Sequence, residues 1–278
     1  MTNTEKVAVV TGAGGTLCSE MARNLAGQGY QVALLGRSLD KLRAVETDIK
    51  NAGGLAISVS TDVSDEVSVR AAHTVVLSKF GAPTLLINGA GGNQMDALTN
   101  TTEFDERELQ DEGSVKGFFN LNMAVFQSVI DINTMGTVIP SFVFGRDMAA
   151  NKRGCILNIA SMNSYRPLSK VGAYGMAKAG IANFTQWLAA YLAPAGVRVN
   201  AIAPGFFLNE RSRQIMFNDD GSETDRAQRI MSHTPMKRFG EAPELIGCMN
   251  WLISDEAAGF ATGIIVPVDG GFLASSGV

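Results

Sequence analysis

The sequence predicts an α/β protein in which one parallel sheet is covered by helices on both faces. A short β-branched run, residues 7–11, leads into a glycine cluster and then into a helical run. Apolar strands and amphipathic helices continue to alternate along the chain at the spacing of β-α-β units. The 30 glycines and the low share of charged residues, 18%, suit a fold with many tight strand-to-helix turns. Together these features predict a doubly wound, Rossmann-type sheet.

The expected elements fill the chain without a linker or a change of composition, so we expect one domain spanning residues 1–278. Residues 205–239 break the alternation with a mixed polar segment, which predicts a substrate lid at about 205–240. Residues 93–120 form a second long polar loop. The expected strands are residues 7–11, 31–36, 55–60, 84–88, 155–160, 197–203 and 263–268. The expected helices include residues 17–26, 39–52, 64–80, 121–148 and 241–254.

The first strand-to-helix turn has the composition of a pyrophosphate-binding loop. Backbone N–H groups and the N-terminus of the following helix bind a pyrophosphate in such turns. The general pattern Gly-x-Gly-x-x-Gly is incomplete, because Leu17 stands in the place of the last glycine. The residues expected to contact the cofactor here are Gly12, Gly14, Gly15, Thr16 and Leu17.

The end of the second strand bears on the choice of cofactor. It reads Gly36-Arg37-Ser38, with no acidic residue to bind the adenosine ribose hydroxyls of NAD. Arg37 can bind the 2'-phosphate of NADP instead, so we predict NADP. NAD remains the alternative, because an arginine can also stack on adenine.

Other strand ends meet at the same edge of the sheet. Asp62, Asn88 and Gly91 follow the third and fourth strands, where ligands of open parallel sheets bind. For Asp62, a role in a turn or helix cap is as consistent with the sequence as an adenine contact.

Tyr174 and Lys178 are four residues apart in a helical segment, so both side chains face the same side. A nearby ammonium group favours the phenolate, which predicts Tyr174 as a proton carrier. Ser161 follows an apolar strand and could polarise a substrate oxygen that Tyr174 also contacts. Taken alone, this spacing also fits a surface pair.

Composition and charge exclude several classes of function. The net charge of −4 gives no reason to expect nucleic acid or an anionic membrane as a partner. The cysteines are scattered, and the two histidines, His73 and His233, have no ligand-like neighbours, so we expect no metal. The first strand follows the N-terminus without a signal peptide, and no run is apolar for long enough to span a bilayer, so we expect a cytoplasmic protein.

Read together, these motifs resemble the short-chain dehydrogenase/reductase family over essentially the whole chain. The motifs are Thr11-Gly12, Asn88-Gly-Ala-Gly91, Asn133, Ser161, Tyr174-x-x-x-Lys178 and Pro204-Gly205, in this order. Thr16 and Cys18 depart from the pattern, since the family usually has glycines at these positions. Asn209 stands where many members have a threonine.

The resemblance implies roles for individual residues. Tyr174 would be the acid/base, Ser161 would hold the carbonyl oxygen, Lys178 would lower the Tyr174 pKa and bind nicotinamide ribose, and Asn133 would hold a relay water. The implied cofactor-lining residues are Gly12, Arg37, Asp62, Val63, Asn88, Ala90, Gly91, Tyr174, Lys178, Pro204 and Gly205.

Further segments are similar to the D-mannonate oxidoreductase (fructuronate reductase) branch, including Asn88-Gly-Ala-Gly-Gly-Asn93 and the chain end Asp269 to Val278. The implied reaction is hydride transfer between D-mannonate and D-fructuronate. Such a substrate needs a cation and several hydrogen-bond donors. The candidates are Asn93, Asn163, Arg166, Asn209 and Arg211.

Two alternatives remain at this stage. The same catalytic residues serve a gluconate 5-dehydrogenase-like or 3-oxoacyl reductase activity. A non-catalytic nucleotide-binding regulator is a different class, which the intact catalytic set disfavours. The resemblance also implies a homo-oligomer, with a tetramer as the expected form.

Overall fold

Across the residues described in the computed structural model, 6–110 and 114–275, seven parallel strands form one sheet in the order β3-β2-β1-β4-β5-β6-β7. Each lies within two residues of a predicted strand, so the predicted fold class is confirmed. The strands are β1 (Val7–Thr11), β2 (Gln31–Gly36), β3 (Leu55–Ser60), β4 (Leu85–Asn88), β5 (Gly154–Ile159), β6 (Val197–Pro204) and β7 (Ile265–Val268).

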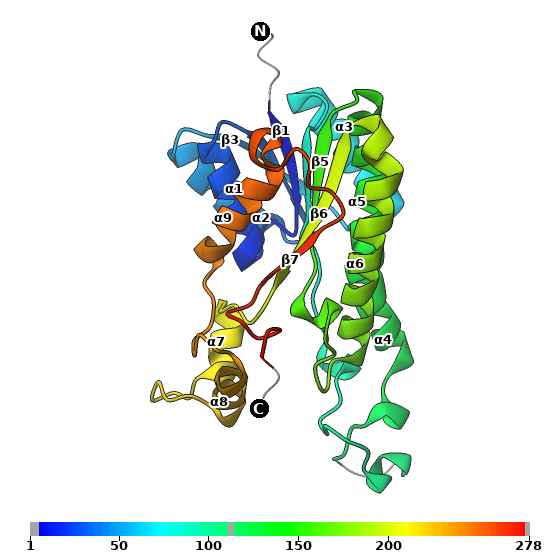
Figure 1. The fold of residues 1–278 in the computed structure, drawn as a ribbon, viewed down its shortest axis with the longest axis vertical. Coiled ribbons are helices and arrows are strands. Elements are labelled where there is room, and N and C mark those ends of the chain that lie inside the picture. Colours follow the sequence, from blue (N-terminus) through cyan, green and yellow to red (C-terminus); the bar gives the residue numbers. More distant parts are fainter. Residues whose placement is uncertain (1–5, 111–113, 276–278) are drawn as a thin grey trace.

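Helices cover both faces of this sheet (Figure 1). One face carries α1 (Thr16–Gly27), α2 (Leu39–Asn51) and α9 (Ile246–Ile253), and the other carries α3 (Glu66–Phe80), α5 (Gly136–Ala150) and α6 (Gly172–Leu192). The alternation of β1 shows why two cores form: Ala8 and Val10 pack in one core, and Val7 and Val9 in the other. Burial of apolar side chains on both faces is the main force that holds these layers together.

The strand order reverses between β1 and β4. The chain builds β1, β2 and β3 outward and then returns to the other side of β1. Helices that follow β1 and β4 therefore leave in opposite directions, which opens a crevice at the carboxyl ends of these two strands.

The helix predicted over residues 121–148 is not continuous. The run 121–148 is divided into α4 (Met123–Ile130), a π-helical segment η4 (Asp131–Met135) and α5. Pro140 has no N–H, so the Gly136 carbonyl loses its donor four residues on. The regular ladder is interrupted here, and the Thr137 hydroxyl donates to the Asn133 carbonyl at 2.9 Å. The sequence prediction missed this π-helical segment.

Another predicted boundary shifts by a capping residue. Helix α3 begins at Glu66 rather than Ser64, because the Asp65 carboxylate accepts hydrogen bonds from the N–H groups of Val67 and Ser68.

The two long polar segments lie at the carboxyl end of the strands, below the sheet in Figure 1. Residues 93–120 contain short 3-10 turns, η1 (Met95–Ala97), η2 (Glu106–Leu109) and η3 (Phe118–Asn120). Residues 205–240 contain α7 (Glu210–Met216) and α8 (Asp225–His233), which pack around a small core of Met216, Ala227, Ile230 and Phe239. Shorter elements are η5 (Met162–Ser164), η6 (Ala193–Ala195), η7 (Ala242–Leu245) and α10 (Asp255–Ala258).

In the part of the chain that the structure describes, none of the helices combines the length and the apolar character needed to cross a bilayer. Within the same residues, no group of three or more His, Cys, Asp or Glu side chains is placed to hold a metal ion.

Candidate active site

The turns after β1 and β4 are held against each other at the crevice. The Thr11 hydroxyl accepts hydrogen bonds from the N–H groups of Gly89 at 3.0 Å and Ala90 at 3.2 Å. Gly12 has a φ of +67°, and a Cβ on it would lie 2.8 Å from the Ala90 backbone. The turn therefore requires glycine at this position, both for its left-handed conformation and for the close approach.

The rest of the glycine turn leaves room for a ligand at the start of α1. Gly15 is exposed, and its N–H donates to the Gly12 carbonyl at 2.9 Å. Thr16 is also exposed and begins α1, and Leu17 packs partly against the core. Small exposed residues at a helix N-terminus fit a pyrophosphate, so the residues present suit a dinucleotide.

A cavity of about 460 Å³ lies between the tip of β2 and the turn after β4 and contains Arg37, Gly91 and Asn93 among its lining residues. Ser64 and Asp131 also line it, and the sequence carried no signal for either of them. Arg37 is exposed at the tip of β2, as predicted from its place after the strand.

Asp62 has a turn role. Its Oδ1 accepts hydrogen bonds from the Ser64 N–H at 3.0 Å and the Ser64 hydroxyl at 2.6 Å. These bonds, more than the nearby Arg37 charge, hold the pKa of Asp62 below its ordinary value. Val63 is buried and packs against Gly136, which joins this turn to α5.

The Asn88 side chain is directed into the protein rather than into the crevice. Its Nδ2 donates to Ser141 Oγ and to Asn158 Oδ1, both at 2.9 Å, and the residue is fully buried. Asn158 in turn donates to the Thr185 hydroxyl at 2.9 Å. The Asn88 side chain thus ties β4 to β5 and α5.

Gly205 follows β6, and its N–H donates to the Val268 carbonyl at 2.9 Å, in line with the Pro204–Val268 pairing of β6 and β7. A Cβ on Gly205 would lie 2.6 Å from Asp269 Cα. The Pro204-Gly205 turn therefore closes directly onto the end of β7.

Ser161 and Tyr174 meet at the carboxyl end of β5. Ser161 is buried just after this strand, and Tyr174 lies in the first turn of α6. A hydrogen bond with Ser161 lowers the pKa of Tyr174, but burial of the phenol is the larger effect and raises this pKa above its ordinary value. The phenol is therefore protonated at neutral pH.

Lys178 lies next to Tyr174 on α6 but does not lower the pKa of this tyrosine in the structure. Its Nζ is 5.5 Å from the centre of the Tyr174 ring and donates to the Ile159 carbonyl at 2.7 Å. Burial lowers the pKa of Lys178 to about 8. The net shift of the Tyr174 pKa is thus opposite to the direction expected, because desolvation acts on both groups.

Asn133 lies in the π-helical segment, fully buried. Its Nδ2 donates to the carbonyls of Gly92 at 2.7 Å and Val129 at 2.8 Å, and its Oδ1 accepts the Gly92 N–H at 3.2 Å. A Cβ on Gly91 would overlap Asn133 Oδ1 and would lie 3.7 Å from Lys178 Nζ. Asn133 therefore fixes the turn after β4 close to Lys178.

The five residues expected to bind a sugar acid have different surroundings. Asn163 is buried, and its Oδ1 accepts the Leu168 N–H at 2.9 Å. Arg166 is exposed, and its Nη1 donates to the Ser275 carbonyl at 3.0 Å. Asn209 caps α7 by accepting the Ser212 N–H at 2.8 Å. Asn93 lines the cavity beside Arg37, and the side chain of Arg211 lies outside those described.

A second cavity, of about 490 Å³, lies between residues 168–171 and α8. Lys170, Arg226, Arg229 and His233 contribute to its lining, and Phe206 and Phe272 form an apolar wall. These cations are not among the site residues predicted from the sequence. Only their spacing indicates them in the sequence. Lys170 precedes Tyr174 by four residues, and Arg226 and Arg229 are spaced for one face of a helix.

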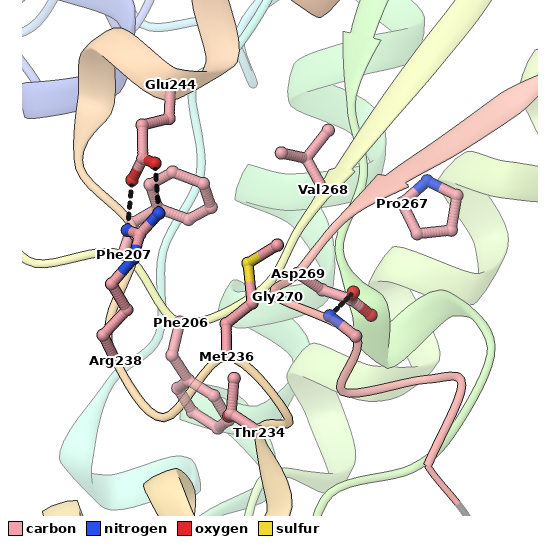
Figure 2. Close-up of a pocket in the computed structure, with 12 residues that line it drawn as sticks. Phe206, Phe207, Thr234, Met236, Arg238, Glu244, Pro267, Val268, Asp269 and Gly270 are labelled. Atoms are coloured by element: carbon pink, nitrogen blue, oxygen red, sulfur yellow. Dashed lines mark hydrogen bonds and ion pairs between the residues drawn. The ribbon is translucent and has the colours of Figure 1, made fainter.

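A third cavity, of about 350 Å³, lies at the carboxyl end of β7 and does not include Ser161, Tyr174 or Lys178 in its lining. Figure 2 shows the Arg238 guanidinium paired with both oxygens of Glu244, at 2.7 and 2.6 Å. This cation is already neutralised by its partner, so the third cavity offers less attraction to an anion than the second one.

Comparison with known proteins agrees with this geometry. The model of the short chain dehydrogenase family matches residues 6–218. The chain belongs to this family. It is an oxidoreductase of the short-chain dehydrogenase type, and its substrate is a separate question, since relatives share the fold and differ in the pocket.

Two similar relatives are described only as uncharacterized oxidoreductases. UxuB of Bacillus subtilis is 46% identical over 273 residues, which cover 98% of this chain and 96% of that protein. A protein of Haemophilus influenzae is 41% identical over 98% of this chain and 95% of its own length.

A crystal structure from Haemophilus influenzae, provisionally named a D-mannonate oxidoreductase and containing bound NAD, superposes with a TM-score of 0.93. It is 40% identical and covers 99% of this chain and 98% of its own.

Proposed function

We propose that this protein transfers a hydride between a nicotinamide cofactor and a sugar acid, with D-mannonate and D-fructuronate as the substrate pair. The contact between Ser161 and Tyr174 at the carboxyl end of β5 is the observation that carries the proposal. The provisional name of the Haemophilus relative supports the choice of substrate.

In this proposal Tyr174 gives a proton to the carbonyl oxygen during reduction and takes one from the hydroxyl during oxidation. Ser161 holds the same oxygen and stabilises the charge that develops on it. The nicotinamide ring supplies or accepts the hydride when it is bound. The raised pKa of Tyr174 supports the reductive direction at neutral pH, because the phenol keeps its proton there.

Lys178 and Asn133 have positioning roles in this reaction. Lys178 presents an amine beside the Tyr174 ring and within reach of the turn after β4, where the nicotinamide ribose is proposed to bind. The side chain of Asn133 holds that turn in place, and in this proposal Asn133 also holds a relay water.

We assign NADP as the preferred cofactor, because Arg37 is exposed at the end of β2 with no acidic residue beside it in the sequence. The NAD found in the Haemophilus relative favours NAD as the second candidate. The choice between NADP and NAD depends on whether Arg37 contacts a 2'-phosphate or stacks on the adenine ring.

Residues 205–240 act as the substrate lid in this proposal. Their small separate core lets α7 and α8 move as a unit over the carboxyl ends of the strands. A homotetramer is proposed as the working form, supported by large exposed apolar side chains on adjacent helices, Phe142 on α5 and Met176 and Trp187 on α6.

The experiment that tests the function is the oxidation of NADPH and of NADH, measured in parallel by absorbance, on addition of D-fructuronate to the purified protein. We expect rapid oxidation of at least one cofactor and its reversal with D-mannonate. Turnover with 5-ketogluconate or a 3-oxoacyl thioester but not with D-fructuronate would refute the substrate assignment. Cofactor binding without turnover on any of these would support the regulatory alternative.

A further inference from the structure

The cavity between residues 168–171 and α8 adjoins the start of α6, the helix that carries Tyr174. Val171 lines the cavity and precedes Tyr174 by three residues at the start of α6. Phe206 follows directly on Gly205, at the proposed cofactor edge, and packs edge-to-face against Phe272 with ring centres 5.6 Å apart. The start of α6, the helix that carries Tyr174, and the lid segment therefore line the same cavity, although Tyr174 itself is not among the lining residues.

The charge of the cavity is opposite to that of the whole chain. Its lining holds three permanent cations, Lys170, Arg226 and Arg229, against one carboxylate, Asp225. The whole chain has a net charge of −4. Among the described residues, the cations of this cavity form no ion pair, whereas Arg238 in the neighbouring cavity is held by Glu244 (Figure 2).

The backbone holds Lys170 at this place in a conformation that lysine rarely adopts. Its φ is +73°, in the left-handed region. The Lys170 carbonyl accepts the Thr99 N–H at 3.2 Å, and buried Asn163 holds the Leu168 N–H two residues earlier. Strained backbone that is fixed from both sides is often found at ligand sites.

Helix α8 presents its arginines from the opposite wall. Arg226 and Arg229 are three residues apart, and His233 follows four residues later, which places all three along one side of the helix. Ala227 packs into the small core of the lid segment, and Ile230 packs there while also lining the cavity. Movement of α8 would therefore carry the arginines toward or away from Lys170.

We propose that Lys170 and Arg229 bind the carboxylate of the substrate across this cavity and make the enzyme selective for sugar acids over uncharged sugars. The inference rests on the proposed function, since a six-carbon keto acid has its keto group and its carboxylate near opposite ends. Lys170 and Arg229 take the carboxylate-binding role that the sequence suggested for Arg166. The Arg166 guanidinium instead donates a hydrogen bond to the Ser275 carbonyl. Asn163 is then a positioning residue, which holds the segment that carries Lys170.

The test compares substrates that differ only in charge. D-Fructose has a hydroxymethyl group where D-fructuronate has its carboxylate. We expect Arg229→Gln and Lys170→Gln each to raise the KM for D-fructuronate by about 10- to 100-fold, with kcat within about threefold. The KM for D-fructose should not change. Glutamine at position 170 is used because it retains a long side chain at the strained φ.

The matched control is Arg43→Gln, on the exposed side of α2 and outside both the lid and the cavity lining, which should leave both KM values unchanged. A KM for D-fructuronate that rises equally in the control, or that does not rise in either cavity variant, would overturn the proposal.

A binding measurement separates this inference from the proposed function. Calorimetric titration of the protein–NADPH complex with D-mannonate and with D-mannitol compares a carboxylate with a hydroxymethyl group without needing turnover. We expect Arg229→Gln to weaken only D-mannonate, by at least tenfold. If the wild type reduces other keto acids but not D-fructuronate, the substrate assignment fails. The proposed carboxylate site is still supported if the same variants raise the KM for those acids. Equal binding of D-mannonate by the wild type and the variants would refute the site.

Discussion

Cys18 and Gly89 share one space: the Cys18 sulfur lies where a side chain on Gly89 would begin. The short-chain dehydrogenase pattern usually has a glycine where this chain has Cys18, which allows helix α1 to pack closely on the strand ends. Here the Cys18 sulfur is buried, and the residue without a side chain is Gly89, in the turn after β4. The departure from the pattern thus leaves the close packing intact.

The first prediction concerns this pair. Gly89→Ala should destabilise the protein by about 1–3 kcal/mol, because its Cβ overlaps the sulfur. Cys18→Ala removes the sulfur, so the double variant should be more stable than the sum of the single effects predicts, by about 1 kcal/mol or more. Urea unfolding of the four proteins measures this coupling. The control is Gly247→Ala, whose added Cβ has no neighbouring atom within 4 Å. Strictly additive stability effects of Gly89→Ala and Cys18→Ala would show that the two side chains do not compete for the same space.

The second prediction concerns proton transfer by Tyr174. Tyr174→Phe should lower kcat by about 10²- to 10⁴-fold and leave the cofactor dissociation constant within about threefold, because only the hydroxyl is lost. Tyr30→Phe, which loses a hydroxyl just before β2 at the amino end of the strands, should retain activity. Stopped-flow turnover and fluorescence titration with NADPH measure the two quantities. Retained turnover in Tyr174→Phe would disprove the role.

The third prediction follows from the raised pKa of Tyr174 and concerns pH. Oxidation of D-mannonate needs the deprotonated phenol, so its rate should rise with pH across the range from 7 to 10. Reduction needs the protonated phenol and should show no loss between pH 6 and 8 from this group. Initial rates in both directions test the claim, and an oxidation rate that falls from pH 7 to 9 would oppose it.

The fourth prediction concerns the energetic cost of burying Lys178. Its pKa falls from an ordinary value of 10.5 to about 8 in the folded protein. Between these pH values the unfolded chain binds a proton that the folded chain does not, so stability rises with pH there through this group. Below pH 8, the lowered pKa of Lys178 reduces the free energy of unfolding by about 3 kcal/mol, since a shift of one pKa unit corresponds to about 1.4 kcal/mol.

Lys178→Met should therefore be more stable than the wild type at pH 7, although it loses the hydrogen bond to Ile159 and all activity. The stability difference between the two proteins should shrink from pH 8 to pH 10.5. Urea unfolding at pH 7 and pH 10 measures it. A stability difference that is the same at both pH values would show that Lys178 is not the source.

The fifth prediction concerns Arg37 and the cofactor. Arg37→Ala should lower kcat/KM with NADPH by about 10- to 100-fold, the value of a charge-assisted hydrogen bond, and change it with NADH by less than threefold. Arg43→Ala, on the exposed side of α2, is the control. Equal losses with both cofactors would instead indicate stacking on adenine and favour NAD.

The amino-acid sequence by itself determined the order of the seven strands and of most helices that cover the sheet, but it predicted neither α7 nor α8 in the lid segment. Local patterns were sufficient for this, because both faces of a parallel sheet are buried and each strand reads as a short apolar run between turns. The glycine turn and the pair of Tyr174 and Lys178 were visible for the same reason, since their spacing is fixed within one element.

The tertiary structure decided what depends on distant parts of the chain. The direction of the Tyr174 pKa shift follows from burial that no spacing reveals. Lys170 and Arg229 are separated by the whole of α6 and β6 in the sequence, and only the return of α8 over the strand ends brings them to one cavity. Side chains that act together across a crevice have no common period, so the fold alone could assemble them.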